Sequence, residues 1–217
     1  MNRREFIRNM AVTAVGVAGA SVLGASVLNT VTASPDKEKK KMKILILTGS
    51  PRKNGNSATL ADSFTKGARE AGHEVVRFDA AFRKVHPCIA CNSCGMNGPC
   101  VFKDDFESVR EHIIPADCVV FATPMYYFGI SAQLKAVIDR FYAINGAIHV
   151  PKKAVLLMTY ANTAASEAVP IQSHYEVLLK YLGWTDAGQV IASGVWPAGA
   201  VQRTRYPEMA YQLGKTI

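Results

Sequence analysis

Short apolar runs alternate with amphipathic helical stretches along most of the chain. Apolar residues fill each run continuously instead of at every second position, which is typical of strands buried on both faces of a parallel sheet. The stretches between the runs repeat apolar residues at helical spacing, as do Leu60, Phe64 and Ala68. Strands are predicted at residues 43–48, 74–78, 118–122, 154–158 and 189–192. The pattern therefore predicts an α/β fold with an open parallel sheet and helices on both faces.

Residues 1–33 have the features of an export signal. A charged region that contains Arg3-Arg4-Glu5-Phe6 precedes a mildly apolar run, and Val31-Thr32-Ala33 offers small residues for cleavage. The pattern resembles a twin-arginine signal, which implies that a folded, cofactor-loaded protein is exported to the periplasm or another extracytoplasmic space. An ordinary secretory signal or an uncleaved membrane anchor is the alternative. Residues 34–42 are expected to form a linker, and residues 43–217 the folded domain.

The composition narrows the possible function classes. Hydrophobic residues make up 49% of the chain and charged residues 19%, as in proteins that bury a normal core. The formal net charge is +8, but much of it lies in residues 1–43, and no basic stripe with interleaved aromatic residues follows. We therefore do not expect nucleic acid to be a partner.

Hydroxyl, amide and glycine residues crowd the loop after the first predicted strand, Thr48-Gly49-Ser50-Pro51-Arg52-Lys53-Asn54-Gly55-Asn56-Ser57. The backbone N–H groups of such a loop can converge on one point, and the positive end of the next helix favours an anion such as a phosphate monoester. The residue order matches neither a Walker loop nor the Gly-x-Gly-x-x-Gly pattern of NAD-binding folds. A polar turn capped by Asn56 or Ser57 is the alternative.

Large apolar side chains stand in the loop after the third predicted strand, Thr123-Pro124-Met125-Tyr126-Tyr127-Phe128-Gly129-Ile130-Ser131. Exposure of these side chains to solvent is unfavourable, and a planar ligand that stacks on them would account for their presence. Packing against their own helix or in a dimer interface is the alternative.

The two loops together resemble those of a known superfamily. The matching residues are Gly49-Ser50-Pro51-Arg52, Gly55-Asn56-Ser57, Pro124-Met125-Tyr126-Tyr127-Phe128-Gly129, Gln133-Leu134-Lys135 and Asp139-Arg140. They are similar to the NADPH-dependent FMN reductase and iron–sulfur flavoprotein superfamily, and the resemblance covers about residues 43–217. It implies a flavodoxin-like three-layer αβα sandwich with five parallel strands in the order 2-1-3-4-5.

The same resemblance implies an FMN site. Ser50, Arg52, Asn56 and Ser57 would hold the FMN phosphate. Pro124, Met125, Tyr126, Tyr127 and Phe128 would flank the isoalloxazine ring. Thr159, Tyr160, Ala161 and Asn162, after the fourth strand, would lie beside the ring, although no distinctive motif marks this third loop.

Four cysteines in an insert at residues 86–103 are candidate metal ligands: Cys88, Cys91, Cys94 and Cys100. Their C-x2-C-x2-C-x5-C spacing could wrap four thiolates around one [4Fe–4S] cluster, and it resembles that of the iron–sulfur flavoproteins. Two disulfides, free thiols or a zinc site are the alternatives. Cys118 lies in a predicted buried strand and is expected to belong to the core.

The sequence thus predicts an FMN-dependent oxidoreductase or electron-transfer flavoprotein with a [4Fe–4S] cluster. A cluster-free NAD(P)H-dependent FMN or quinone reductase and a non-enzymatic electron carrier are the alternatives. Reduced nicotinamides are scarce outside the cytoplasm, so we expect a redox protein or membrane component as donor, and a redox protein or small molecule as acceptor. We expect no acid–base catalyst. The apolar loop residues favour a homodimer or homotetramer, and membrane contact is expected only if the signal stays uncleaved.

Overall fold

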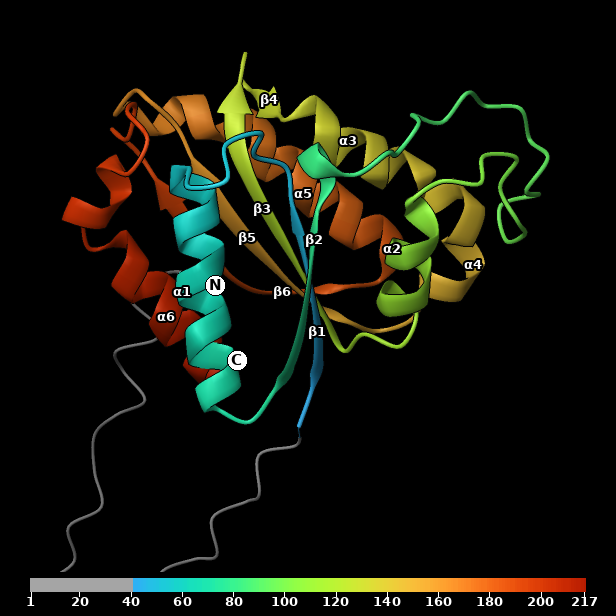
Figure 1. The fold of residues 1–217 in the computed structure, drawn as a ribbon, viewed down its shortest axis with the longest axis horizontal. Helices are drawn as coiled ribbons and strands as arrows, with labels where there is room; N and C mark the ends of the chain where they lie inside the picture. The colour runs from blue at the N-terminus through green and yellow to red at the C-terminus, as the bar shows by residue number, and fades with distance from the viewer. Residues whose placement is uncertain (1–40) are drawn as a thin grey trace, which may run out of the picture. The chain divides into compact units, whose positions relative to one another are not determined.

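The computed structural model describes residues 41–217, in which strands and helices alternate along the chain (Figure 1). The strands are β1 (Lys43–Thr48), β2 (Glu74–Asp79), β3 (Cys118–Tyr126), β4 (Gly129–Ile130), β5 (Lys153–Thr159) and β6 (Thr185–Ala192). The α-helices are α1 (Asn56–Glu70), α2 (Phe106–Ile113), α3 (Ala132–Asp139), α4 (Asn145–Ile148), α5 (Val169–Leu182) and α6 (Tyr206–Thr216). Short 3-10 helices connect them at η2 (Ala80–Phe82), η3 (Arg140–Ile144), η4 (Ala165–Ala168) and η5 (Ala200–Arg203).

The strands form one sheet with the order β2-β1-β3-β5-β6, and each neighbouring pair in this order is parallel. β5 and β6 are the fourth and fifth strands expected from the sequence, so the predicted flavodoxin-like fold and strand order are confirmed. The sequence pattern does not predict β4, which pairs antiparallel with the end of β3. Part of the segment expected to be a loop is therefore a hairpin.

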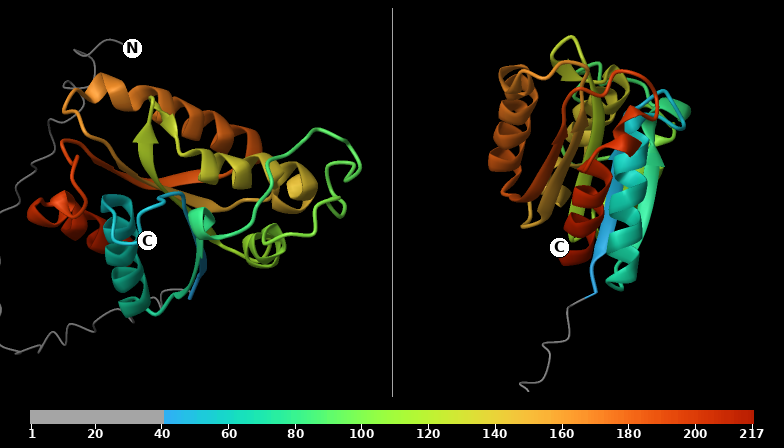
Figure 2. Two further views of the ribbon diagram at one scale, coloured as in Figure 1. Left: turned by 45° about the horizontal axis from the view of Figure 1, so that its top comes forward. Right: turned by 90° about the vertical axis from the view of Figure 1, so that its left-hand side faces the viewer.

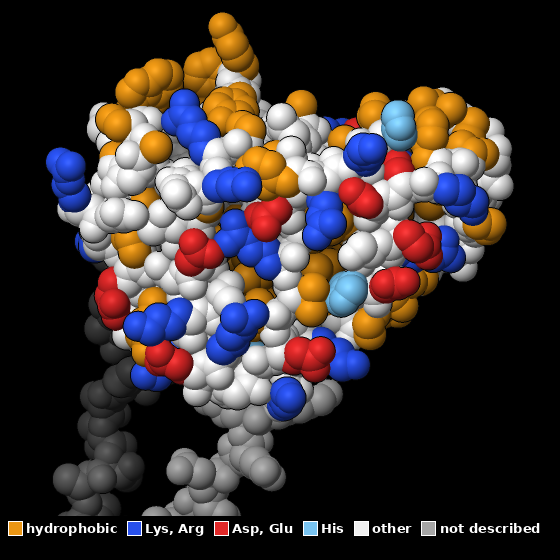
Figure 3. Space-filling model, viewed as in Figure 1, with side chains coloured by type: hydrophobic (Ala, Val, Ile, Leu, Met, Phe, Trp, Pro, Cys, Tyr) orange, Lys and Arg blue, Asp and Glu red, His pale blue; other side chains and the backbone are white. Residues whose placement is uncertain are grey.

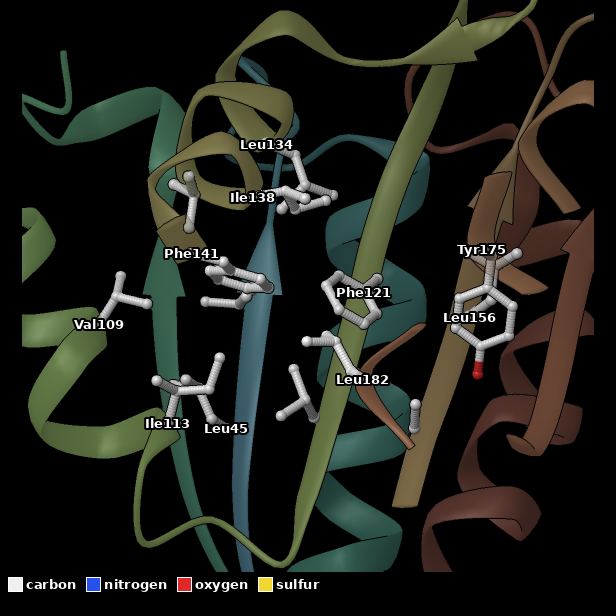
Figure 4. Packing of buried hydrophobic residues seen from close by; sticks show 14 of the residues in the cluster. Leu45, Val109, Ile113, Phe121, Leu134, Ile138, Phe141, Leu156, Tyr175 and Leu182 are labelled. Carbon is white, nitrogen blue, oxygen red and sulfur yellow. The ribbon is translucent and has the colours of Figure 1, made fainter. Parts of the chain in front are cut away.

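Apolar side chains of α2, α3 and α5 cover one face of the sheet. Phe121 of β3 lies among them, with its ring 6.1 Å from that of Tyr175 and 6.4 Å from that of Trp184 (Figure 4). The hydroxyl of the buried Tyr175 donates a hydrogen bond to Asp186 Oδ1 over 2.9 Å, so this polar group is not left unpaired. Burial of each large side chain contributes about 2 kcal/mol, so this cluster is a main source of stability.

Helices α1 and α6 cover the opposite face, as Figure 2 shows. Leu60 and Phe64 of α1 are fully buried there. The two helices pack so closely that a Cβ on Gly67 would overlap the carbonyl oxygen of Tyr211, and a Cβ on Gly214 would overlap that of Phe64. Glycine at both positions lets the backbones touch, which fixes α1, and the loop that precedes it, against the sheet.

The strand order changes direction at β1: β2 lies on one side of it and β3, β5 and β6 lie on the other. Open α/β sheets bind ligands outside the carboxyl ends of their strands at such a switch point. The loops after β1, β3 and β5 all leave the sheet at this edge. The fold therefore brings the three loops that the sequence singles out to one place.

The predicted export signal at residues 1–33, and all of the predicted linker except its last two residues, lie outside the described residues. Met42, at the end of that linker, packs into the core on the α1 side with 8% of its surface exposed. Within residues 41–217, none of the helices has both the length and the apolarity that a membrane crossing requires.

Candidate functional site

One pocket of about 280 Å³ opens at the carboxyl edge of the sheet. It brings together nine of the residues predicted to bind the cofactor: Ser50, Arg52, Asn56, Ser57, Pro124, Met125, Tyr126, Tyr127 and Thr159. Tyr160 and Ala161 also line it, whereas Phe128 and Asn162 do not. The exposed Asn162 instead donates a hydrogen bond from its side-chain amide to Glu167 Oε1 over 2.9 Å.

The part of the pocket formed by the loop after β1 has the features of an anion site. Helix α1 begins at Asn56, after Gly55, and no side chain caps it. The N–H groups of its first turn have no intrahelical partner, and the helix dipole adds positive potential there. Ser50 Oγ accepts a hydrogen bond from the Arg52 N–H over 3.2 Å, and a Cβ on Gly55 would lie 2.9 Å from that Oγ. This compact turn of backbone donors fits a phosphate group.

The side chain of Asn56 anchors the segment that follows β6. Its nitrogen donates to the carbonyl oxygens of Val195 and Pro197 over 2.8 and 2.9 Å. Its oxygen accepts a hydrogen bond from the Val201 N–H over 3.2 Å. With these bonds made, the group of Asn56 best placed to bind an anion is its backbone N–H.

Ser57 and Thr159 form a second link across the pocket wall. Ser57 Oγ lies 2.9 Å from Thr159 Oγ1, and both residues are buried. The pair joins the start of α1 to the end of β5. Asn56 and Ser57 do not cap the helix, which was the alternative expected from the sequence. Gly55 is the N-cap residue, and no side-chain capping bond forms at this end of α1.

The β3–β4 hairpin forms the aromatic side of the pocket. Tyr126 pairs with Gly129, so Tyr127 and Phe128 make a two-residue turn, with φ angles of 44° and 61°. This left-handed backbone is unfavourable for bulky residues, and turns of this kind usually contain Asn-Gly. Tyr127 is fully exposed, and apolar surface gathers over the hairpin at the top of the view (Figure 3). Strain combined with exposed rings is typical of a functional contact.

Sequence reasoning missed two residues of the pocket, Val195 and Trp196. Trp196 is 73% exposed, which is unusual for so large an apolar side chain. Both residues follow the last predicted strand, residues 189–192, and belong to no motif. A tryptophan just beyond the carboxyl end of a strand was the one signal available, since this is the edge at which ligands bind.

A second cavity, of about 270 Å³, lies within the cysteine-rich segment. The four predicted ligands line it as free thiols: Cys88, Cys91, Cys94 and Cys100. In the described part of the chain, no three His, Cys, Asp or Glu side chains are grouped so as to hold a metal ion. The segment runs between η2 and α2 as a long irregular loop (Figure 1). Cysteine thiolates are the ligands that an iron–sulfur group needs, so the four side chains fit such a group by type, although the described side chains are not gathered around one point.

The five thiols of the chain differ in chemistry. Hydrogen bonds with Ser93 lower the pKa of the exposed Cys91. Burial raises the pKa of the Cys118 thiol to about 12. Cys118 is fully buried in β3, as predicted, and takes no part in the cysteine cavity.

A doubly wound parallel sheet, with a pocket that joins an anion site to an aromatic hairpin at the switch point, defines a flavodoxin-like α/β protein. Residues 42–197 match the NADPH-dependent FMN reductase family. The chain therefore belongs to this family and is an FMN-dependent oxidoreductase.

Relatives agree with this assignment. An iron-sulfur flavoprotein of Archaeoglobus fulgidus is 31% identical over 180 residues, which cover 81% of this chain and 79% of that protein. An iron-sulfur flavoprotein of Methanocaldococcus jannaschii is 35% identical over 99 residues, which cover 46% of this chain and only 51% of the relative. An NAD(P)H:quinone oxidoreductase from Methanothermobacter marburgensis has a TM-score of 0.67 at 23% identity, over 81% of this chain and 96% of that one. At this identity the likeness shows the fold alone.

Proposed function

We propose that the pocket at the carboxyl edge of the sheet binds FMN, with the phosphate at the start of α1 and the isoalloxazine ring beside Pro124–Tyr127. The observation that carries the proposal is that one pocket joins an uncapped helix N-terminus to a strained, exposed aromatic turn. An anionic tail and a flat ring in one molecule match these two ends.

The residues of the pocket have separate tasks in this proposal. The backbone N–H groups of Asn56 and Ser57, with the charge of Arg52, bind the phosphate. Tyr126 and Tyr127 cover the ring and exclude water from one side. Thr159 offers its hydroxyl at the end of β5. Bound FMN supplies hydride or single-electron chemistry, and no side chain of the pocket is required as an acid–base catalyst.

We propose further that Cys88, Cys91, Cys94 and Cys100 hold a [4Fe–4S] cluster. Their spacing, their free thiols in one cavity, and the iron-sulfur flavoprotein relatives support the proposal. Coupled to FMN, such a cluster makes the protein a converter between one-electron and two-electron chemistry. Two disulfides or a zinc site would not give that coupling.

The N-terminal sequence leads to the remaining part of the proposal. Export by a twin-arginine signal in residues 1–33 would place the loaded protein in the periplasm, where reduced nicotinamides are scarce. We therefore propose that a redox protein or a membrane component donates the electrons rather than NAD(P)H. The exposed aromatic hairpin supports a homodimer or homotetramer.

One anaerobic experiment tests the function. The protein is purified without oxygen, and its visible spectrum, FMN content, iron and acid-labile sulfide are measured. We expect one FMN and about four irons per chain for a single cluster. FMN without iron would support a cluster-free FMN or quinone reductase, and FMN reduction without turnover of small acceptors would support an electron carrier. Absence of flavin after reconstitution would contradict the proposal.

The electron donor is tested on the same sample. We expect a reduced ferredoxin-type protein to reduce the bound FMN faster than NADPH does. Rapid reduction by NADPH would contradict the proposed donor, but it would leave the FMN site unaffected.

A further inference from the structure

Arg140 and Asp104 form an ion pair inside the protein, beside the cysteine cavity. Arg140 Nη1 lies 2.9 Å from Asp104 Oδ2 and Nη2 lies 3.2 Å from Oδ1, so the guanidinium binds the carboxylate with two parallel hydrogen bonds. Only 2% of the Arg140 side chain and 7% of the Asp104 side chain are exposed. Burial alone would raise the pKa of Asp104, but hydrogen bonds from Arg140 and from the His86 and Phe106 N–H groups hold that pKa below its ordinary value. Both partners are therefore charged where little water reaches.

The same ion pair lies where the two ends of the cysteine-rich segment, residues 86–103, join the rest of the fold. Arg140 Nη1 also donates to the carbonyl oxygen of His86 over 2.9 Å, and Nη2 donates to that of Phe102 over 3.4 Å. His86 and Phe102 lie on either side of the four cysteines in the sequence, and their rings stack with centroids 4.8 Å apart. Arg140 thus ties together the two points at which the segment leaves and rejoins the fold.

One donor of Arg140 remains without a partner. A guanidinium has five N–H groups, and the four on Nη1 and Nη2 account for the contacts described above. The Nε atom is buried and has no hydrogen-bond partner among the described residues. Arg140 lines the same cavity as the four cysteines. A buried, unpaired N–H is unfavourable, so its presence indicates an acceptor that residues 41–217 do not provide.

We propose that Arg140 is a positioning residue for the group held by the four cysteines, and that its Nε–H donates to a sulfur of that group. The inference rests on the proposed [4Fe–4S] cluster. A cluster with four thiolate ligands is anionic, and hydrogen bonds to its sulfurs, together with nearby positive charge, raise its reduction potential. Arg140 provides a hydrogen bond and a positive charge, and Asp104 offsets part of that positive charge.

The test uses the full chain, loaded with FMN and reconstituted anaerobically with iron and sulfide. Arg140→Lys keeps the charge but removes Nε and the planar fork, so we expect less iron per chain and a cluster potential shifted to more negative values. Asp104→Asn leaves the charge of Arg140 unopposed, so we expect a shift to more positive values. The potentials are measured by EPR during redox titration. Arg77→Lys, which alters a partly exposed arginine paired with Asp62 and Asp79, is the matched control and should keep the wild-type potential.

Opposite shifts separate an electrostatic role from a loss of structure, because a loosened segment would lose iron in both variants without shifting the potential in opposite directions. FMN content and thermal unfolding report whether the rest of each variant is folded. If Asp104→Asn does not fold, Arg140→Gln replaces it, and its potential should be more negative than that of Arg140→Lys.

Two outcomes would overturn the inference, and they are distinguishable. If wild-type protein binds the cluster and Arg140→Lys keeps the wild-type potential, or Arg140→Lys and Asp104→Asn shift it the same way, the proposed role of Arg140 is wrong, but the cluster is not contradicted. Where Arg140→Gln replaces Asp104→Asn, a potential no more negative than that of Arg140→Lys would contradict the role. If wild-type protein binds FMN but no iron, the proposed cluster is wrong and the inference falls with it.

Discussion

The side-chain nitrogen of Asn56 donates to the carbonyl oxygen of Val195 over 2.8 Å, across 139 positions of the sequence. With the bonds to Pro197 and Val201, this contact fastens the segment that carries Trp196 to the start of α1. The residue that begins the helix of the anion site therefore also holds the opposite wall of the pocket. Loss of its side chain should affect both stability and cofactor binding.

We predict that Asn56→Ala lowers the free energy of unfolding by about 2–4 kcal/mol, because each buried polar group left unpaired costs about 1–3 kcal/mol. The FMN dissociation constant should rise about tenfold as the wall loosens, which corresponds to about 1.4 kcal/mol. Urea unfolding and flavin fluorescence titration measure the two effects. Gln212→Ala, which removes an exposed bond within α6, should change stability by less than about 0.5 kcal/mol. Unchanged FMN affinity in folded Asn56→Ala would contradict the anchoring role.

Arg52 is exposed and lines the pocket, where its charge can reach a phosphate. We predict that Arg52→Ala weakens FMN binding about fivefold, since an exposed charge contact contributes roughly 1 kcal/mol. Riboflavin, which lacks the phosphate, should bind equally well to both proteins. Lys53→Ala is the control, because Lys53 lies over the Phe82 ring and does not line the pocket. An equal loss of affinity for FMN and riboflavin would mean that Arg52 does not bind the phosphate.

Most of the fold could be predicted because the central strands β1, β3 and β5 are buried on both faces over most of their length. Continuous apolar runs such as residues 44–47 and 154–158 have no other stable place than between two helical layers. The hairpin at β4 could not be predicted in this way. It is two residues long, and its turn carries Tyr127 and Phe128 in a backbone conformation that favours Asn-Gly, so local propensity argues against it.

The candidate site could likewise be predicted only in part. The anion-binding loop after β1 could be predicted because glycine, hydroxyl and amide residues are concentrated in it. The side-chain partners of Asn56 could not be predicted, since they depend on which loops the sheet order brings together. Asp104 illustrates the same limit: its position before α2 explains the hydrogen bond that it accepts from the Phe106 N–H, but nothing local indicates its pairing with Arg140.

The hairpin turn offers a test of strain stored at the site. We predict that the double variant Tyr127→Asn with Phe128→Gly raises the free energy of unfolding by at least about 2 kcal/mol, since each of the two bulky residues in the left-handed region costs at least about 1 kcal/mol. The same variant should bind FMN more weakly or turn over acceptors more slowly, because the aromatic side of the pocket is lost. Denaturant unfolding measures the change in stability, and FMN titration measures the change in affinity. A less stable variant would show that the aromatic residues support the turn rather than strain it.

Asp104 should make the stability of the protein depend on pH in the acid range. Its folded pKa lies below the unfolded value of about 3.9, so the charged form contributes stability above that value and loses it as the pH falls through the folded pKa. We predict that wild-type protein is more stable than Asp104→Asn at pH 7, and that the difference shrinks below about pH 4. Chemical unfolding at a series of pH values measures it. A difference that stays constant down to pH 2 would contradict a titrating ion pair.

The cysteines should react in an order set by exposure and pKa. Only the thiolate is nucleophilic, so the exposed Cys91, whose pKa is lowered by Ser93, should be alkylated fastest in cofactor-free protein. Cys118 is buried in β3 with its pKa raised to about 12, so it should react only after denaturation. Iodoacetamide labelling followed by peptide mass spectrometry measures each site. Loading with iron and sulfide should protect Cys88, Cys91, Cys94 and Cys100 together, since all four would be ligands of one group. Protection of only two of them on loading would contradict a single group held by all four.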